Sequence, residues 1–275
     1  SGLWYYFKTT KHYWARVMIS KIKKLKSKKN KSKIICLTAY SKNVAEVIDQ
    51  YSDIILIGDS LGSVLYNYNS TRKVTLNTMI EHSKSAKLGI RKSLMVVDMP
   101  YKTYRNKSEA LRNAKKIIKL TKCDAVKLEG GIKISKIIEH LIKNRVQVMG
   151  HLGVLPQSIR GNFKSKGKNE KEKKQLLKEA KLLEELGVFA IVLECVKSSV
   201  ASLITKSIKI PTIGIGSSVN CDGQVLVTDD LLGLNETKIK FVKKFVDLKK
   251  TINLGIKKFR KEVKSKKYPS KKYSY

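Results

Sequence analysis

Five short apolar runs end in side chains that can do acid–base or metal chemistry. The runs and the residues at their ends are Ile54–Ile57 with Asp59 and Ser60, Leu94–Val97 with Asp98, Ala125–Leu128 with Lys127 and Glu129, Val146–Met149 with His151, and Ala190–Leu193 with Glu194. A single carboxylate in such a place could simply cap the helix that follows it. However, five successive runs end in this way, and two of them end in Glu, which is a poor helix cap. This repetition favours one shared functional site.

Three of these residues predict a metal site. If Asp59, Asp98 and Glu129 lie in one small volume, the three carboxylates repel one another. They cannot all stay ionised without a cation. A set of oxygen ligands suits Mg²⁺, whereas zinc prefers His and Cys. Because Mg²⁺ usually keeps several waters, one of the three carboxylates would act through a water. We therefore predict a Mg²⁺ site made by Asp59, Asp98 and Glu129.

The other polar residues predict acid–base and anion-binding roles. Lys127 and Glu129 are two residues apart on one strand, so both should point to the same face. The Lys127 ammonium could then hold an anionic substrate or stabilise negative charge that develops on it. Glu194 follows an apolar run, where desolvation would raise its pKa towards the range of a general base. For His151, a hydrogen-bonded core residue and a site residue are equally good interpretations.

The elements that must position these residues alternate between strand and helix. Continuous apolar runs are typical of parallel strands covered on both faces, and two more such runs are Ile34–Leu37 and Thr212–Ile215. Helical patterns lie between the runs at Asn43–Gln50, Leu76–Leu88, Ser108–Leu120, Ile134–Lys143, Lys171–Leu186 and Ser199–Ser207. With Lys240–Phe245 as a short eighth strand, this order predicts a single-domain α/β fold, a (β/α)8 TIM barrel, whose active site lies at the carboxyl ends of the strands.

An open doubly wound sheet is the structural alternative. The glycine pair Gly214 and Gly216 lacks the third glycine of a dinucleotide-binding fingerprint, which favours the barrel. Residues 1–17 have no clean period and are interpreted as a doubtful N-terminal extension. The barrel domain is then predicted over 18–275, with a basic C-terminal tail from about Lys257.

Composition narrows the classes of function. The net charge is +36, but only eight of the 58 basic residues are Arg, which phosphate and base recognition favours. Nucleic-acid binding is therefore not expected, and the lysines are interpreted as a solvated surface. The four cysteines are far apart, which fits a reducing compartment. No apolar run approaches the roughly 20 residues of a membrane span, so we expect a soluble protein.

Short motifs follow one another in order from about Lys33 to the tail. They are Leu37–Tyr40, Ile57–Gly62, Ser70–Thr71 with Val74–Leu76, Val97–Pro100, Val126–Gly131, Met149–Gly153 with Pro156–Ser158, Val192–Cys195, and Ile213–Gly216 with Asp222–Val225. Together they resemble the ketopantoate hydroxymethyltransferase family. That resemblance implies a cytoplasmic barrel enzyme that transfers a hydroxymethyl group from 5,10-methylenetetrahydrofolate to 3-methyl-2-oxobutanoate, and a homo-oligomer.

The resemblance also implies a role for each site residue. Asp59, Asp98 and Glu129 match the Mg²⁺ positions, and Glu194 matches the proton acceptor. Four residues match contacts to the 2-oxo acid: Asp59, Ser60, Asp98 and Lys127. His151 matches a family histidine near the substrate.

Three departures from the family and two competing functions remain. Ser41 stands where the family usually has Asp, and Asp229 where it has His. The loop over residues 159–170 is shorter than the family's. A related barrel lyase that cleaves C–C bonds of oxo acids would share the metal site without needing folate. A cationic nucleic-acid-binding protein is the third hypothesis, and it would show a steep dependence of affinity on salt.

Overall fold

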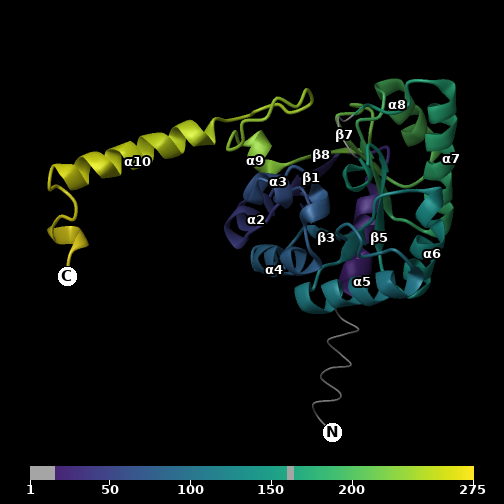
Figure 1. Cartoon of the computed structure of the whole chain (residues 1–275), viewed down its shortest axis with the longest axis horizontal. Helices are drawn as coiled ribbons and strands as arrows, with labels where there is room; N and C mark the ends of the chain where they lie inside the picture. Colours follow the sequence, from purple (N-terminus) through teal and green to yellow (C-terminus); the bar gives the residue numbers. More distant parts are fainter. Residues whose placement is uncertain (1–15, 160–163) are drawn as a thin grey trace, which may run out of the picture. The chain divides into compact units, whose positions relative to one another are not determined.

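A closed barrel of parallel strands forms the centre of the protein in the computed structural model, which describes residues 16–159 and 164–275. Within these residues eight strands pair in chain order, and β1 closes the barrel against β8 (Figure 1). Their bounds are β1 Ile34–Thr38, β2 Ile54–Ile57, β3 Leu94–Asp98, β4 Ala125–Lys127, β5 Val148–Gly153, β6 Ala190–Glu194, β7 Thr212–Ile215 and β8 Gly223–Leu226. The predicted (β/α)8 barrel is confirmed, and the open doubly wound sheet is excluded.

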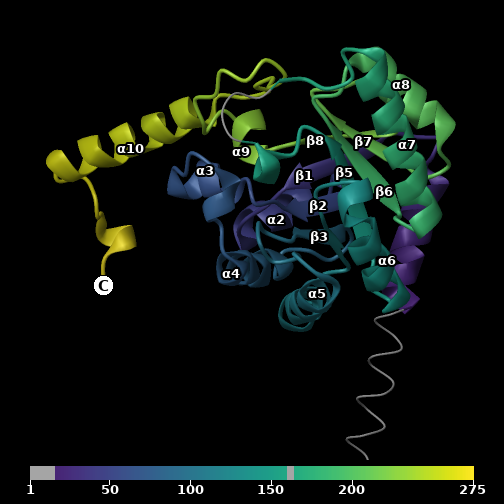
Figure 2. The same ribbon diagram turned by 45° about the vertical axis from the view of Figure 1, so that its right-hand side comes forward.

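Helices alternate with the strands and surround them (Figure 2). After a helix over residues 16–27 come α2 Lys42–Ile48, α3 Leu61–Tyr66, α4 Leu76–Lys87, α5 Lys107–Thr121, α6 Ser135–Lys143, α7 Glu170–Leu186 and α8 Ser198–Ser207. Short 3₁₀ turns are η1 Thr71–Lys73, η2 Ile132–Ile134, η3 Pro156–Ser158 and η4 Lys271–Tyr273. Neighbouring helices pack in the order α2, α4, α5, α6, α7 and α8, as the outer ring of a barrel requires.

Helix α5 shows how the sequence specifies these helices. The Asn106 side chain accepts a hydrogen bond from the Glu109 backbone N–H at 2.9 Å, which caps the first turn. Ala110, Ala114 and Ile117 then follow at helical spacing, and all three are fully buried on one face. These three side chains belong to the core layer between the helices and the outer faces of the strands, and α5 packs beside α4 and α6.

Alternation along each strand separates two layers of the core. Residues such as Ile55, Val97 and Leu193 belong to the layer that packs against the helices. Residues one position away, such as Val96 and Val192, belong to a second layer inside the barrel. Because side chains alternate with a period of two, every second residue after these interior positions also points inward.

The helix over residues 16–27 closes the amino-terminal mouth of the barrel. Its Met18, Ile22 and Leu25 are buried in the same layer as the interior strand residues. Lysines from residues 21–29 also pair with aspartates that precede strands: Lys21 with Asp124 at 3.3 Å, Lys28 with Asp53 at 2.6 Å and Lys29 with Asp222 at 2.7 Å. The proposed boundary between 17 and 18 stays a prediction, and residues 1–15 lie outside the described residues.

The eighth strand is not where the sequence pattern put it. The prediction of a strand at Lys240–Phe245 is wrong, because this segment is turn and irregular structure. Instead Gly223–Leu226 pairs with both β7 and β1, so no strand edge remains to which Lys240–Phe245 could bind. Glycine and the exposed Gln224 interrupt the apolar pattern of this strand, which hid it from a search for continuous apolar runs.

Residues Val227–Tyr275 form a compact unit of their own. It contains α9 Thr228–Leu231 and the basic helix α10 Leu248–Lys264. The backbone N–H groups of Phe245 and Leu248 donate to the carbonyls of Leu231 and Leu232, both at 2.9 Å. In the described part of the chain, no helix has the length and apolarity needed to cross a membrane.

A buried aspartate organises the turn before β3, and its removal should destabilise the barrel. The Asp49 carboxylate accepts the backbone N–H groups of Arg91, Lys92 and Ser93 at 2.9–3.0 Å. Burial alone would raise the pKa of Asp49, but these amide hydrogen bonds outweigh it and hold the pKa below its ordinary value of 3.8. Replacing Asp49 by Ala leaves three N–H groups without this acceptor, so we expect a loss of about 2–3 kcal/mol in the free energy of unfolding.

Urea unfolding of the Asp49→Ala variant at several pH values checks this. A depressed folded-state pKa means that the stabilisation is present above the ordinary pKa and is lost as pH falls through the folded value. The difference from wild type should therefore be full at pH 7 and should shrink below about pH 4. Glu46→Ala, at an exposed position of α2, the helix that ends just before Asp49, is the matched control. A difference that does not change with pH would contradict the role of the charge.

Candidate active site

Four of the predicted site residues face the inside of the barrel at its carboxyl-terminal mouth. Asp98, Lys127 and Glu194 are the last residues of β3, β4 and β6. His151 lies near the end of β5 and pairs in register with Val192, an interior residue of β6. Each of the four is two residues beyond an interior residue of its own strand, and the period of two directs it inward.

Lys127 is the centre of the cluster. Its ammonium lies 3.2 Å from Asp98 Oδ1 and 3.0 Å from His151 Nδ1, and the residue is 5% exposed. Burial alone would lower the pKa of Lys127, but the negative charges of Asp98, Glu129 and Asp59 outweigh it and raise the pKa above its ordinary value. Lys127 therefore provides a fixed positive charge inside the mouth.

The neighbours of His151 define its protonation. An ammonium has only donors, so Lys127 must donate to Nδ1, and the proton of a neutral ring must sit on Nε2. Burial, and then the charge of Lys127, lower the pKa of His151, which favours this neutral form. Nε2 lies 3.1 Å from Glu194 Oε2, although not in line for a hydrogen bond. The ring thus places its Nε2 beside the Glu194 carboxylate.

Glu194 is the most accessible carboxylate of the cluster. Its side chain is 19% exposed, compared with 6% for Asp98 and 3% for Glu129. The Glu194 carboxylate is therefore more accessible to solvent than the apolar run before it predicted. The position at the rim gives it access both to the barrel interior and to a molecule that enters from solvent.

Asp59 and Glu129 complete a group of crowded carboxylates. The Asp59 backbone N–H donates to Asp98 Oδ2 at 3.0 Å, which joins the ends of β2 and β3. Burial, and then the charge of Asp98, raise the pKa of Asp59 to about 7. Burial, and then the charge of Asp59, raise the pKa of Glu129 well above its ordinary value. A divalent cation bound near these carboxylates would offset the repulsion between their negative charges.

The three carboxylates do not form a complete metal site on their own. Among the described residues, no three His, Cys, Asp or Glu side chains are arranged to hold one ion together. However, Asp98 Oδ1 is a buried oxygen without a hydrogen bond from any residue that the structure describes, since Lys127 is near it but not aligned. Mg²⁺ typically uses one or two carboxylates and keeps its waters. The residues present thus fit a Mg²⁺ ion that one or two of these carboxylates would hold, with waters completing its ligands.

Sequence reasoning missed two polar residues of the site, Gln157 and Tyr104. Gln157 is in η3, and its side chain reaches Asp59 while its backbone N–H reaches Glu129. Tyr104, in the loop after β3, donates its hydroxyl proton to the Gln157 side-chain oxygen. The motif Pro156–Ser158 contained the signal for Gln157, but the motif alone assigned it no role. No sequence signal marked Tyr104.

Ser60 and Gly153 lie at the rim of the barrel mouth. Ser60 is the residue before α3 and is half-buried, and its hydroxyl lies 2.7 Å from the hydroxyl of Tyr40. Gly153 ends β5 with a φ of +97°, and a Cβ there would lie 2.2 Å from the Glu194 backbone oxygen. Glycine is therefore required at this position for β5 to approach β6 where Glu194 projects.

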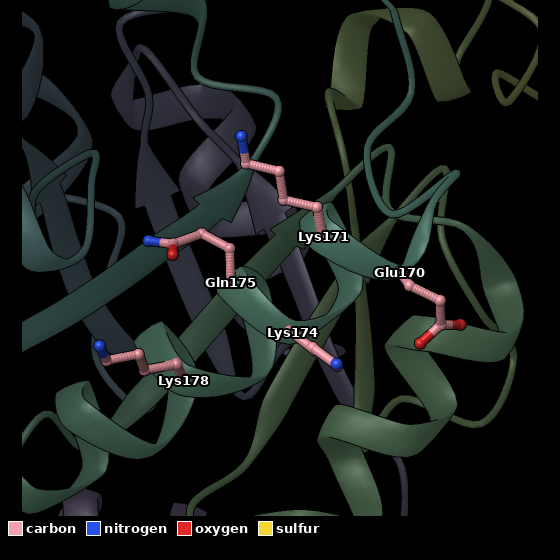
Figure 3. Close-up of a pocket in the computed structure, with 5 residues that line it drawn as sticks. All are labelled: Glu170, Lys171, Lys174, Gln175 and Lys178. Carbon is pink, nitrogen blue, oxygen red and sulfur yellow. The ribbon is translucent and has the colours of Figure 1, made fainter.

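A separate shallow pocket lies on the outer helix α7 (Figure 3). Glu170, Lys171, Lys174, Gln175 and Lys178 line it, and their side chains spread outward from a single helix. None of the predicted site residues lines this pocket. Its residues are suitable control positions, because they lie on one outer helix.

The fold is a (β/α)8 barrel, and a buried lysine and crowded carboxylates lie at its carboxyl-terminal mouth, where barrel enzymes have their active sites. Solved structures with this fold include a 2,3-dimethylmalate lyase of the PEP mutase/isocitrate lyase superfamily, with a TM-score of 0.59, 11% identity and coverage of 94% of this chain and 91% of that one. A phosphonopyruvate hydrolase in complex with oxalate and Mg²⁺ has a TM-score of 0.58, 11% identity and coverage of 92% and 93%. At such identities the likeness concerns the fold alone.

The chain belongs to the ketopantoate hydroxymethyltransferase family, whose model matches residues 16–271. The 3-methyl-2-oxobutanoate hydroxymethyltransferase of Pelagibacter ubique is 63% identical over 258 residues, which cover 94% of this chain and all of the relative. The enzyme of the same name from Anaplasma marginale is 41% identical over 260 residues, covering 94% of each chain. The resemblance drawn from the motifs is confirmed, and with it the assignment as a hydroxymethyltransferase of this family.

Proposed function

We propose that this enzyme transfers a hydroxymethyl group from 5,10-methylenetetrahydrofolate to 3-methyl-2-oxobutanoate. The product is ketopantoate, which makes this the first step of pantothenate biosynthesis. Family membership and the names of the relatives support the reaction. The single observation that carries the chemistry is the buried cluster in which Lys127 lies between Asp98 and His151 while Glu194 stands at the rim.

The 2-oxo acid is proposed to bind at the centre of this cluster. Lys127 is the fixed cation that would attract its carboxylate or 2-oxo oxygen, because its charge is retained inside a dry site. Ser60 offers a hydroxyl at the rim of the same mouth, with Asp59 and Asp98 beside it. The substrate itself would exclude water from the buried end of the site when it binds.

Glu194 is proposed to remove the C3 proton of the oxo acid. It is the accessible carboxylate of the cluster, and Nε2 of His151 lies 3.1 Å from one of its oxygens. This leaves the other oxygen to accept a proton from the substrate. Lys127 would stabilise the negative charge that develops on the 2-oxo oxygen as the proton leaves. The resulting carbon nucleophile then attacks the methylene carbon of the folate as one of its C–N bonds breaks. Water supplies the hydroxyl to the same carbon as the second C–N bond breaks. The C3 proton and the remaining proton of the water end on the two folate nitrogens, and tetrahydrofolate leaves.

Mg²⁺ is proposed as the resident cation, held by Asp59 and Asp98 and reached by Glu129 through a water. When bound there, it would act as a Lewis acid that polarises the 2-oxo group. The crowded carboxylates and the unbonded oxygen of Asp98 support this choice. The protein residues still bind the acid, orient it and accept its proton.

An assay for labelled product tests the proposed function. With 3-methyl-2-oxobutanoate and methylene-labelled 5,10-methylenetetrahydrofolate, wild type should form labelled ketopantoate, and EDTA should suppress it until Mg²⁺ is restored. Label in the product separates the transferase from an oxo-acid lyase that needs no folate. If no labelled ketopantoate forms in the presence of Mg²⁺, the proposed function is wrong.

Three further expectations accompany this function. We propose a homo-oligomer in the cytoplasm, with no role in nucleic-acid binding despite the charge of +36. Light scattering gives the oligomeric state. A salt titration of RNA binding tests the last point, since genuine phosphate binding would weaken steeply between 50 and 200 mM salt.

A further inference from the structure

Gln157 makes four polar contacts at the active site, and three of them come from its side-chain amide. Its Nε2 donates to Asp59 Oδ2 at 2.8 Å and to the Met99 backbone oxygen at 3.0 Å, while its Oε1 accepts the Tyr104 hydroxyl proton. Its backbone N–H donates to Glu129 Oε2 at 2.9 Å. One residue of the loop after β5 thereby joins the ends of β2, β3 and β4.

These bonds leave one oxygen of each carboxylate without a hydrogen bond from Gln157. Asp59 is held through Oδ2, and no hydrogen bond to Oδ1 is formed within the described residues. Glu129 is held through Oε2, and its Oε1 lies 3.8 Å from His151 Nδ1. A carboxylate fixed through one oxygen presents the other in a defined direction, which lowers the cost of ordering it when a ligand binds.

Tyr104 fixes which way the Gln157 amide faces. Its hydroxyl group donates to Oε1, so the NH₂ end must point to Asp59 and Met99. The same hydroxyl oxygen accepts the Glu129 backbone N–H at 3.4 Å. Gln157 is 4% exposed, so a reversed amide would bury an oxygen against the Asp59 carboxylate.

We propose that Gln157, oriented by Tyr104, is a positioning residue that sets the divalent-cation affinity of the Asp59 and Glu129 carboxylates. The inference rests on one part of the proposed function, namely that these carboxylates bind a divalent cation. Gln157 does not itself touch the substrate or the ion. It acts through Asp59 and Glu129, as the outer partners of metal ligands do in other proteins.

Cation binding without substrate or folate tests the proposal. Mn²⁺ binding is followed by the loss of the free-ion signal in electron paramagnetic resonance, and Mg²⁺ binding by calorimetry. Gln157→Ala keeps the backbone N–H to Glu129 and removes only the amide, and we expect affinity to fall about 10–100-fold. Gln175→Ala, the same change on the exposed face of α7, should keep wild-type affinity.

Tyr104→Phe is the second variant, and it keeps the proposal testable if Gln157→Ala does not fold. Loss of the orienting hydroxyl should weaken cation binding about fivefold. Because Tyr104 acts mainly through Gln157, the double variant should bind Mn²⁺ about as weakly as Gln157→Ala alone. Tyr51→Phe, at a tyrosine that is 72% exposed, is the control.

The outcomes separate this inference from the proposed function. Wild-type affinity in folded Gln157→Ala overturns the inference, even where the melting temperature falls, because a purely structural role would lower only stability. If the two substitutions lower the Mn²⁺ affinity additively in the double variant, Tyr104 does not act through Gln157. Wild type that binds no Mn²⁺ overturns the inference even if it forms ketopantoate, whereas failure of the proposed function is read from product formation alone.

Discussion

Replacing Glu194 by Gln is expected to lower kcat by about 10²–10⁴-fold while 3-methyl-2-oxobutanoate still binds. Gln has nearly the same shape as Glu but cannot accept the C3 proton, and general-base catalysis typically supplies a factor of this size. The binding residues are unchanged, because Lys127 keeps its contacts to Asp98 and His151. A loss in kcat with little change in binding identifies a group that acts in the transition state.

Exchange of the C3 proton measures the same step without folate. In D₂O, wild type should replace the C3 proton of the oxo acid with deuterium, as followed by NMR, and Glu194→Gln should not. The control is Glu81→Gln, whose side chain is 58% exposed on α4 and pairs with Lys84. Exchange at the wild-type rate in Glu194→Gln would show that another group is the base.

Replacing Asp98 by Ala is expected to abolish the Mg²⁺ dependence of oxo-acid binding. Asp98 is the carboxylate that contacts both Lys127 and the Asp59 backbone N–H, and it keeps one buried oxygen without a hydrogen bond. Its loss removes a proposed ligand and leaves the Lys127 ammonium with one carboxylate fewer. Calorimetric titration of the oxo acid with and without Mg²⁺ should then give the same Kd.

The chain offers a closely matched control for this variant. Asp53 also pairs with a lysine, Lys28 at 2.6 Å, and also accepts a backbone N–H, that of Ile35 at 3.0 Å. It precedes β2 at the opposite mouth of the barrel. Asp53→Ala should lower stability and leave the Mg²⁺ dependence intact. A folded Asp98→Ala variant whose Mg²⁺ affinity equals that of wild type would count against Asp98 as a ligand.

Most of the barrel could be predicted because its strands are buried on both faces. Ile54–Ile57 and Thr212–Ile215 were predicted at their observed bounds, since a buried parallel strand is a continuous apolar run. Val146–Met149 was predicted two residues too early at its start, because Val146 is buried without belonging to the strand. β8 was missed, as its Gly223 and Gln224 lack the apolar pattern and only pairing with β7 and β1 makes it a strand.

The site could be predicted as a set of residues but not as a set of contacts. Strand spacing places Lys127 and Glu129 on one face, and position at strand ends collects Asp98, His151 and Glu194 at one mouth. The sequence pattern does not indicate that Lys127 donates a hydrogen bond to His151 or that Gln157 donates one to Asp59. These contacts join residues separated by 24 and 98 positions, so they depend on how β4, β5 and the loop after β5 pack.

The amino-acid sequence by itself determined the strand and helix order, the inward direction of alternate side chains and the family, because each depends on local pattern or on motifs in order. The tertiary structure alone decided which carboxylate is accessible, which nitrogen of His151 carries the proton and which neutral amide holds the acidic residues in place. Those properties depend on distances of about 3 Å between different strands and on exclusion of water, and neither exists before the barrel closes.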